Sequence, residues 1–294
     1  MVSFPPMAQE RLDASLDIDR RSTPEIVRII QEQDRLVADA VAHEAEPIAQ
    51  AIDRIAERLA RGGRLFYSGA GTSGRIAMLD AAELPPTFGV APSLVRVLMA
   101  GGERAFLAAA EGAEDDEGAA LAAVDREVTT GDAVVGVAAS GTTPYTVAVV
   151  RRAKQRGALT VGITSAPESP LAREAEIAIV PRTGPEVILG STRMKSGTAQ
   201  KLVLNTISTG VMIRLGRVYS NLMIEMPVTN EKLRRRGVRM VELAAGVSGP
   251  AAEQALRDAA GNVKLAAVMA KRRVSMDEAR RLLETRKLRE VLEE

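Results

Sequence analysis

Three segments of the chain combine glycines with serine and threonine hydroxyls in a way that suits the binding of an anion. The first loop is SGAGTSG (68–74), the second is ASGTTPY (139–145) and the third is ILGSTRMKSGT (188–198). Glycine lets the backbone approach a ligand closely, and a helix that begins there offers unpaired N–H groups at its positive end. We therefore expect these loops to hold a phosphate or a similar anion.

Ten residues of the three loops are candidate substrate contacts, because they supply backbone N–H groups, hydroxyls or positive charge. Arg193 and Lys195 could pair with a phosphate or a carboxylate, or could be ordinary surface charges, and the sequence leaves both possibilities open. The ten residues are Gly71, Thr72, Ser73, Ser140, Gly141, Thr142, Thr143, Ser191, Arg193 and Lys195.

The first loop also matches the dinucleotide pattern G-x-G-x-x-G, but its context argues against a dinucleotide. That pattern needs an acidic residue near the end of the next strand to bind the ribose hydroxyls. Here the corresponding run ends VLMAGG, and the first acid after it is Glu103. A dinucleotide would not account for the second loop, and no Walker sequence is present. Ordinary strand-to-helix turns are the remaining alternative to a phosphate site.

The residues that could move protons are few. The chain has no cysteine and one histidine, His43, which we expect on a helix face as a surface or packing residue. Thiolate chemistry and cysteine-based metal sites are excluded, and serine–histidine catalysis and histidine-rich metal sites are disfavoured. Acid–base chemistry must then come from carboxylates, lysine or tyrosine.

The elements that would position these loops are strands alternating with helices. Buried parallel strands form short, nearly continuous apolar runs, and intervening helices imply parallel crossovers. The fold class expected is therefore α/β, a doubly wound five-stranded parallel sheet with helices on both faces, and its ligands bind at the carboxyl ends of the strands. The predicted strands are 64–69, 94–100, 132–140, 159–165 and 176–182.

Helical segments flank the sheet on both sides in the sequence. Ser22 and Glu25 form a capping-box pattern before one helix, a second helix is expected at about 36–60, and a long one at 195–215. After about residue 245 three or four short helices are expected. The resulting division is an N-terminal helical segment (1–54), a sheet domain that carries the three anion-binding loops (55–218) and a C-terminal helical region (219–294).

Composition narrows the class of partner. The 294 residues are 46% hydrophobic and 2% aromatic, with a net charge of +1. This balance gives no electrostatic reason to expect a nucleic acid or an anionic membrane. No apolar run reaches the length of a membrane span and no signal peptide is visible, so a cytoplasmic protein is expected.

Several long motifs together resemble one family, the N-acetylmuramic acid 6-phosphate etherases of the sugar isomerase (SIS) superfamily. The similarity covers nearly the whole chain, and family members often have Cys-Pro-Pro where this chain has Leu84-Pro85-Pro86. The motifs are GAGTSGRIAMLDAAELPPTFG, EGAEDD, ASGTTPY, GSTRMKSGTAQKLVLNTISTG and NLMIEMPVTNEKL.

The resemblance implies a reaction and its catalytic residues. The lactyl ether at C3 of the phosphorylated sugar is cleaved by an elimination and a water addition, without a metal or an organic cofactor. The catalytic carboxylates of the family map onto Glu83, in DAAEL, and Glu114, in EGAED. The setting implied is bacterial cell-wall recycling by a homodimer.

The chemistry of the residues agrees with that pair. One carboxyl must be protonated while the other is ionised, so they need different surroundings. Glu83 lies among apolar neighbours in the sequence, which would raise its pKa and suit the acid; Glu114 suits the base. Ten helical residues separate Ser73 from Glu83, about 15 Å. Unless the phosphate sits mainly on the 140–143 loop, we therefore expect Glu83 to serve the partner subunit's substrate across a shared site.

Two other functions fit the same fold. One is an aldose–ketose isomerase, which also needs a carboxylate base at C2. The other is a non-catalytic sugar-phosphate sensor, in which the C-terminal helices would bind a partner protein.

Overall fold

The computed structural model of the chain describes residues 10–108, 110 and 112–293. These residues form two compact units. The first comprises the described residues up to Ala82 together with Ser93–Val211. The second comprises Glu83–Pro92 and the described residues from Met212 onward.

The first unit is built on a five-stranded sheet, as the sequence predicts. Its strand order is β2-β1-β3-β4-β5 and every neighbouring pair is parallel. All residues of β1, β3 and β4 are buried, which explains their unbroken apolar runs. The strands are β1 (Leu65–Gly69), β2 (Val95–Met99), β3 (Ala133–Val137), β4 (Leu159–Ile163) and β5 (Ile177–Ile179).

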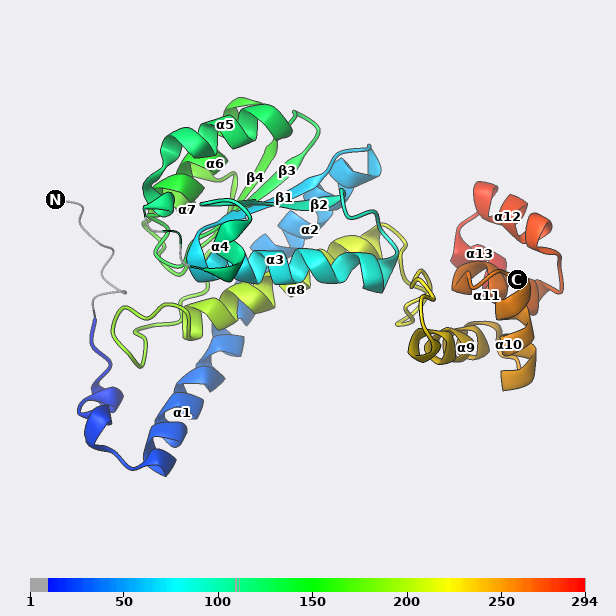
Figure 1. Cartoon of the computed structure of the whole chain (residues 1–294), viewed down its shortest axis with the longest axis horizontal. Coiled ribbons are helices and arrows are strands. Elements are labelled where there is room, and N and C mark those ends of the chain that lie inside the picture. The colour runs from blue at the N-terminus through cyan, green and yellow to red at the C-terminus, as the bar shows by residue number, and fades with distance from the viewer. Residues whose placement is uncertain (1–9, 109, 111, 294) are drawn as a thin grey trace. The chain divides into compact units, whose positions relative to one another are not determined.

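Helices cover both faces of this sheet, which confirms the doubly wound arrangement (Figure 1). On one face Phe66 of β1 packs in a common core with Val124 and Val149, from two helices. On the other face the Tyr67 hydroxyl donates to Asp80 of α3. The first face carries α5 (Glu117–Glu127), α6 (Pro144–Gln155) and α7 (Pro170–Glu174); the second carries α2 (Ala45–Ala60), α3 (Gly71–Phe88) and α8 (Lys195–Arg214).

The N-terminal helices differ from the prediction at one point. Helix α1 (Thr23–Ala42) begins after Ser22, whose N–H donates to the Glu25 carboxylate at 3.0 Å. The expected helix at 36–60 is wrong, because the chain turns at His43 and Glu44 before α2. The Glu44 carboxylate accepts from the Val180 N–H at 2.8 Å, so this turn is tied to the end of β5. His43 therefore ends α1, exposed, instead of lying on a helix face.

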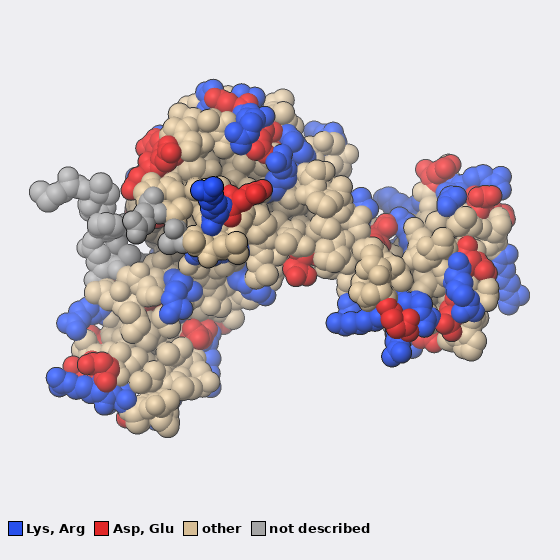
Figure 2. Space-filling model, viewed as in Figure 1, with Lys and Arg blue, Asp and Glu red and all other residues tan. Residues whose placement is uncertain are grey.

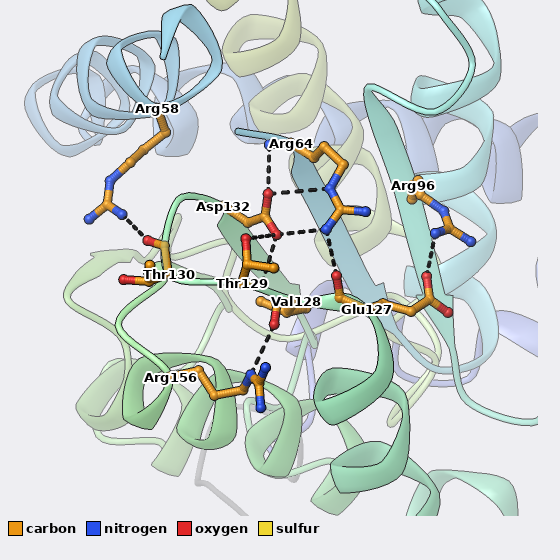
Figure 3. Close-up of polar contacts among 9 residues, drawn as sticks. All are labelled: Arg58, Arg64, Arg96, Glu127, Val128, Thr129, Thr130, Asp132 and Arg156. Atoms are coloured by element: carbon orange, nitrogen blue, oxygen red, sulfur yellow. Dashed lines mark hydrogen bonds and ion pairs between the residues drawn. The ribbon is translucent and has the colours of Figure 1, made fainter. Parts of the chain in front are cut away.

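The amino edge of the sheet is closed by a network around a buried aspartate, Asp132, which directly precedes β3 (Figure 3). Its carboxylate accepts from the backbone and guanidinium of Arg64 and from the backbone and hydroxyl of Thr129. Burial raises the pKa of Asp132, but these hydrogen bonds outweigh burial and hold the pKa below its ordinary value.

Arginines also bind the backbone carbonyls of the turn before β3 (Figure 3). These carbonyls belong to the last residue of α5 and to the residues just after it, and they have no helical N–H partner. Each guanidinium therefore donates a hydrogen bond to a carbonyl that no helical N–H reaches. The pairs are Arg64 with Glu127 O, Arg156 with Val128 O, and Arg58 with Thr130 O.

The second unit contains five helices around its own apolar core, in which Ile224, Val241, Leu256 and Val268 are buried. Four of them follow residue 245, as predicted, and the Ser275 hydroxyl accepts from the Glu278 N–H at 3.3 Å at the last capping-box pattern. They are α9 (Glu231–Ala245), α10 (Gly249–Asp258), α11 (Val263–Arg272), α12 (Met276–Thr285) and α13 (Leu288–Glu293).

Charged side chains of both signs are interspersed over the visible surface of each unit (Figure 2). On that face neither sign gathers into one large patch. Within the described residues, no helix has both the length and the apolar character needed to cross a membrane.

Candidate active site

The first loop passes directly from β1 into α3. Gly71, the first residue of the helix, has a φ of +52°, a left-handed conformation that side chains other than glycine adopt with strain. Thr72 and Ser73 follow in the first turn and are half-buried. The structure thus places both hydroxyl residues at the carboxyl edge of the sheet, where the sequence predicts the ligand.

The second loop is tighter and leaves a helix start open. Ser140 accepts from the Thr142 N–H at 3.2 Å and from its hydroxyl at 2.9 Å. Gly141 has a φ of +65°, and a Cβ there would collide with the Ser169 hydroxyl. Thr143, the N-cap of α6, makes no capping hydrogen bond through its side chain. The first turn of α6 therefore keeps N–H groups available for an anion.

The third loop differs, because the start of α8 is already occupied by a carboxylate of the chain itself. The two oxygens of Glu186 accept from the backbone N–H groups of Lys195 and Ser196, each at 2.9 Å. Glu186 is buried. These amides do not face an open anion site, whereas the start of α6 has no side-chain cap.

Lys195 does not lie at the surface, so the surface alternative for its charge is wrong. Its side chain is 1% exposed and its ammonium donates to Gln33 of α1 at 2.9 Å. Burial lowers the pKa of Lys195, and the negative charges of Glu186 and Asp34 oppose that shift. In the same loop Arg193 is exposed and Ser191 half-buried.

The structure brings Glu114 to the first loop. Glu114 lies in a single 3-10 turn (Ala113–Asp115) before α5 and is exposed. It lines a pocket of about 220 Å³ together with Gly71 and Arg75 of α3. The sequence separates Glu114 from Gly71 by most of a βα unit, but the parallel crossover places both at the carboxyl edge.

Glu83 lies on α3 but lacks the apolar enclosure that its sequence neighbours suggest. It is exposed. Its neighbours Ala81 and Leu84 are buried on the other side of the helix, whereas Leu79 is 57% exposed. The expectation of an apolar pocket around Glu83 is therefore wrong for the single chain.

A buried polar network that the sequence did not reveal fixes α3 in place. The Asp80 carboxylate accepts from the Tyr67 hydroxyl at 2.8 Å, the Asn205 amide at 2.5 Å and the Ser208 hydroxyl at 3.0 Å. These bonds tie α3 to β1 and to α8. A tyrosine in an apolar strand and an aspartate in register with buried Ala77 and Leu84 were the available signals.

Two of the tyrosines are unsuited to act as bases. Burial, with the negative charge of Asp80 beside it, raises the pKa of Tyr67 well above its ordinary value. Burial also raises the pKa of Tyr145 to about 12. Both phenols stay protonated at neutral pH, which leaves carboxylates as the accessible acid–base groups of the carboxyl edge. No group of three metal-ligating side chains occurs among the described residues.

Comparison with known proteins agrees with the fold. The family model for the SIS domain matches residues 30–165. The solved structure of a candidate phosphosugar isomerase involved in capsule formation, from Bacteroides fragilis, superposes with a TM-score of 0.50 at 23% identity. The match covers 66% of this chain and 98% of that one. The likeness extends to the fold alone.

Sequence relatives identify the family. A protein of Symbiobacterium thermophilum named N-acetylmuramic acid 6-phosphate etherase is 57% identical over 89% of this chain and 87% of its own length. One of Clostridium beijerinckii with the same name is 50% identical over 95% of this chain and 92% of its own. The chain belongs to the N-acetylmuramic acid 6-phosphate etherase family.

Proposed function

We propose that this chain is a carbon–oxygen lyase that cleaves the lactyl ether at C3 of N-acetylmuramic acid 6-phosphate. The products are N-acetylglucosamine 6-phosphate and D-lactate. The names of the relatives support this assignment. The observation that carries it in the structure is the shared pocket of Glu114 and Gly71, which puts a carboxylate beside a predicted phosphate loop.

The reaction proceeds on the open-chain sugar, whose C1 carbonyl makes the C2 proton acidic. A base removes that proton, the C3–O bond breaks with both its electrons on oxygen, and an acid protonates the departing lactate hydroxyl. Water then adds across the C2–C3 double bond, with hydroxide at C3 and a proton at C2. The net change is hydrolysis of the ether, and each proton transfer contributes about 10²–10⁴-fold in rate.

The second loop is the principal phosphate site in this proposal, because the start of α6 is uncapped and Ser140, Thr142 and Thr143 surround it. Thr72 and Ser73 of the first loop contribute hydroxyls from the neighbouring strand. Ser191 and Arg193 remain direct contacts to the substrate in this proposal. The buried Lys195 instead holds the third loop in place through its hydrogen bond to Gln33 of α1. The remaining residues of the ten, Gly71 and Gly141, allow close backbone approach.

Glu83 and Glu114 are the acid–base pair of this proposal, with Glu114 as base. An acid must be held protonated, which apolar surroundings favour, and Glu83 of one chain is exposed. A second subunit lying over exposed Leu79 and Glu83 would enclose this carboxyl in apolar surroundings and raise its pKa. We therefore propose a cytoplasmic homodimer in which Glu83 acts on the partner's substrate.

The length of α3 supports the shared site. Ser73 and Glu83 lie on one continuous helix, about 15 Å apart along its axis. The C3 oxygen of a sugar lies much closer than this to its own 6-phosphate. If Thr72 and Ser73 contact the phosphate together with the second loop, that phosphate and a proton from the same chain's Glu83 suit two different substrates, one in each subunit. A phosphate held by the second loop alone would not require this.

The assay for the reaction is D-lactate release from N-acetylmuramic acid 6-phosphate by purified protein. In heavy water the amino sugar product should carry deuterium at C2, because the proton removed there is replaced from solvent. Retention of the original C2 hydrogen would point to direct displacement at C3. Equal turnover of the dephosphorylated sugar would contradict the phosphate site.

The shared site is tested by subunit exchange between two inactive proteins. One carries Glu83→Ala and the other a disabling change in the second loop. Random exchange should restore about a quarter of full activity, since half the dimers are mixed and each mixed dimer has one intact site. Mixed dimers that form but stay inactive would show that Glu83 serves its own chain.

A further inference from the structure

The pocket beside the first loop has an unusual lining. Among the described residues, five alanines and two glycines form its wall, and the charged residues that line it are Arg75 and Glu114. Its volume of about 220 Å³ lies below the roughly 300–1,000 Å³ typical of pockets that hold a whole small ligand. The pocket therefore suits one small substituent of a substrate, with a methyl-sized apolar part and an anionic part.

Arg75 is held in this pocket without neutralisation of its charge. Its guanidinium donates to the carbonyls of Phe106 at 3.2 Å and Ala108 at 3.1 Å. Both partners are neutral, and within residues 10–108, 110 and 112–293 no carboxylate forms an ion pair with it. A guanidinium has five N–H donors, so three remain for an anion. Its two carbonyl contacts hold it in a fixed position for binding a carboxylate.

The sheet order sets the pocket's distance from the phosphate site. Ala70 follows β1 and Ala100 follows β2, so the pocket spans the ends of these two strands. The second loop follows β3, on the other side of β1. Neighbouring strands are about 4.8 Å apart, so one to two spacings, about 5–10 Å, separate the two sites. That interval is the scale of one sugar ring.

We propose that this pocket is the lactyl subsite, in which Arg75 binds the lactyl carboxylate and the alanines receive the lactyl methyl group. The inference rests on the proposed function and assigns a part of the substrate to it. Arg75 then determines specificity, because a neutral ether at C3 would leave its charge unpaired. Glu114 lies in the same pocket and is thereby placed beside the ether that breaks.

The test compares two substrates that differ in one charge. They are N-acetylmuramic acid 6-phosphate and its lactamide, in which a neutral amide replaces the carboxylate. Arg75→Met should lower kcat/KM for the acid by about 10–100-fold, the loss expected for a charged hydrogen-bonded pair. For the lactamide the change should be about twofold or less. Arg75→Lys, which keeps the charge, should keep part of the discrimination.

Two further variants separate recognition from folding. Arg104→Met removes an exposed arginine that directly precedes the pocket residue Ala105 but does not line the pocket. It should leave kcat/KM for both substrates within about twofold of the wild-type values. Ala113→Leu narrows the pocket without removing charge. It should raise KM for the lactyl ether about tenfold while leaving inhibition by N-acetylglucosamine 6-phosphate, which lacks the lactyl group, unchanged.

The outcomes are distinguishable. A folded wild-type protein that releases no D-lactate would overturn the proposed function. If the enzyme is active and Arg75→Met lowers kcat/KM equally for both substrates, the lactyl subsite alone would be overturned. Arg75 would then only hold the carbonyls of Phe106 and Ala108 in place, or would contact the phosphate. The subsite would also be overturned if Ala113→Leu weakened substrate binding and inhibition by N-acetylglucosamine 6-phosphate to the same extent.

Discussion

The two edges of the same sheet are built on opposite principles. At the amino edge Asp132, Arg64 and the backbone carbonyls before β3 satisfy one another (Figure 3). At the carboxyl edge the start of α6 has no side-chain cap, and Glu114 and part of Arg75 face an open pocket. One edge holds the strands together, and the other keeps donors and acceptors free for a substrate.

The difference has a physical cause. A buried polar group without a partner costs free energy, so an edge that binds nothing must satisfy its own groups. A binding edge must leave such groups at the surface, where water satisfies them until a ligand replaces it. The third loop combines the two principles, because Glu186 already occupies the amides of α8 within the carboxyl edge. Substitutions at the two edges should therefore affect different measurements.

The largest effect is expected for Glu114→Gln at the carboxyl edge. The amide keeps the size of the side chain but cannot take a proton, so kcat should fall by about 10²–10⁴-fold. Because Glu114 is exposed, the free energy of unfolding should change by less than about 0.5 kcal/mol. Steady-state D-lactate release and urea unfolding measure the two quantities.

Glu117→Gln is the matched control for that experiment. Glu117 is an exposed carboxylate of the same acidic run, outside the pocket lining, and activity should persist. A Glu114→Gln protein that keeps wild-type kcat would remove Glu114 from the chemistry and would favour a role as part of a solvated acidic surface.

The opposite pattern is expected for Asp132→Asn at the amino edge. It removes a buried charge that accepts hydrogen bonds from Arg64 and Thr129, so the free energy of unfolding should fall by about 2–3 kcal/mol. In the residual folded protein kcat/KM should stay within about twofold. Asp125→Asn, which breaks exposed ion pairs, should cost less than about 1 kcal/mol. Equal losses from Asp125 and Asp132 would contradict the contrast between buried and exposed pairs.

The stability provided by Asp132 should also depend on pH. Its pKa in the folded chain lies below its ordinary value of 3.8, so the folded state binds this proton less readily than the unfolded state. The stabilisation is therefore complete above that ordinary value and is lost as the pH falls through the lower folded pKa. Urea unfolding at neutral pH and near pH 3 should show the difference between wild type and Asp132→Asn shrinking in acid. If the stability difference between wild type and Asp132→Asn grows on acidification, the pKa of Asp132 would be raised in the folded chain instead of lowered.

The sequence was sufficient for the fold because the strands are short, apolar and separated by helices. All five strands were found, each shorter than predicted, and β3 and β5 have only about half their predicted length. The break at His43 was missed although Pro47, which lies in the first turn of α2, is a signal for a helix start there. The turn itself is held by Glu44, which accepts from the Val180 N–H, a contact across more than a hundred residues. Amphipathic periodicity continues through such a turn and does not reveal it.

For the site, the sequence predicted residue types better than their surroundings. Glycines and hydroxyls mark the loops, and parallel topology brings Glu114 to Gly71. Burial could not be predicted for single side chains: Glu83 proved to be exposed although its sequence neighbours are apolar, and Lys195 proved to be buried although its sequence context left a surface position open. Glu186 escaped notice because a helix cap nine residues upstream is not a local pattern.

The smallest effect is expected for Ser140→Ala in the second loop. Ser140 accepts from Thr142, so its loss both frees that residue and removes one donor to the phosphate. One hydrogen bond is worth about 0.5–1.5 kcal/mol, so KM should rise by about 2–12-fold with little change in kcat. Thr130→Ala, an exposed hydroxyl at the amino edge, should leave KM unchanged. If Ser140→Ala lowers kcat while KM stays constant, the second loop acts on the chemical step, and the phosphate must be assigned to the first loop.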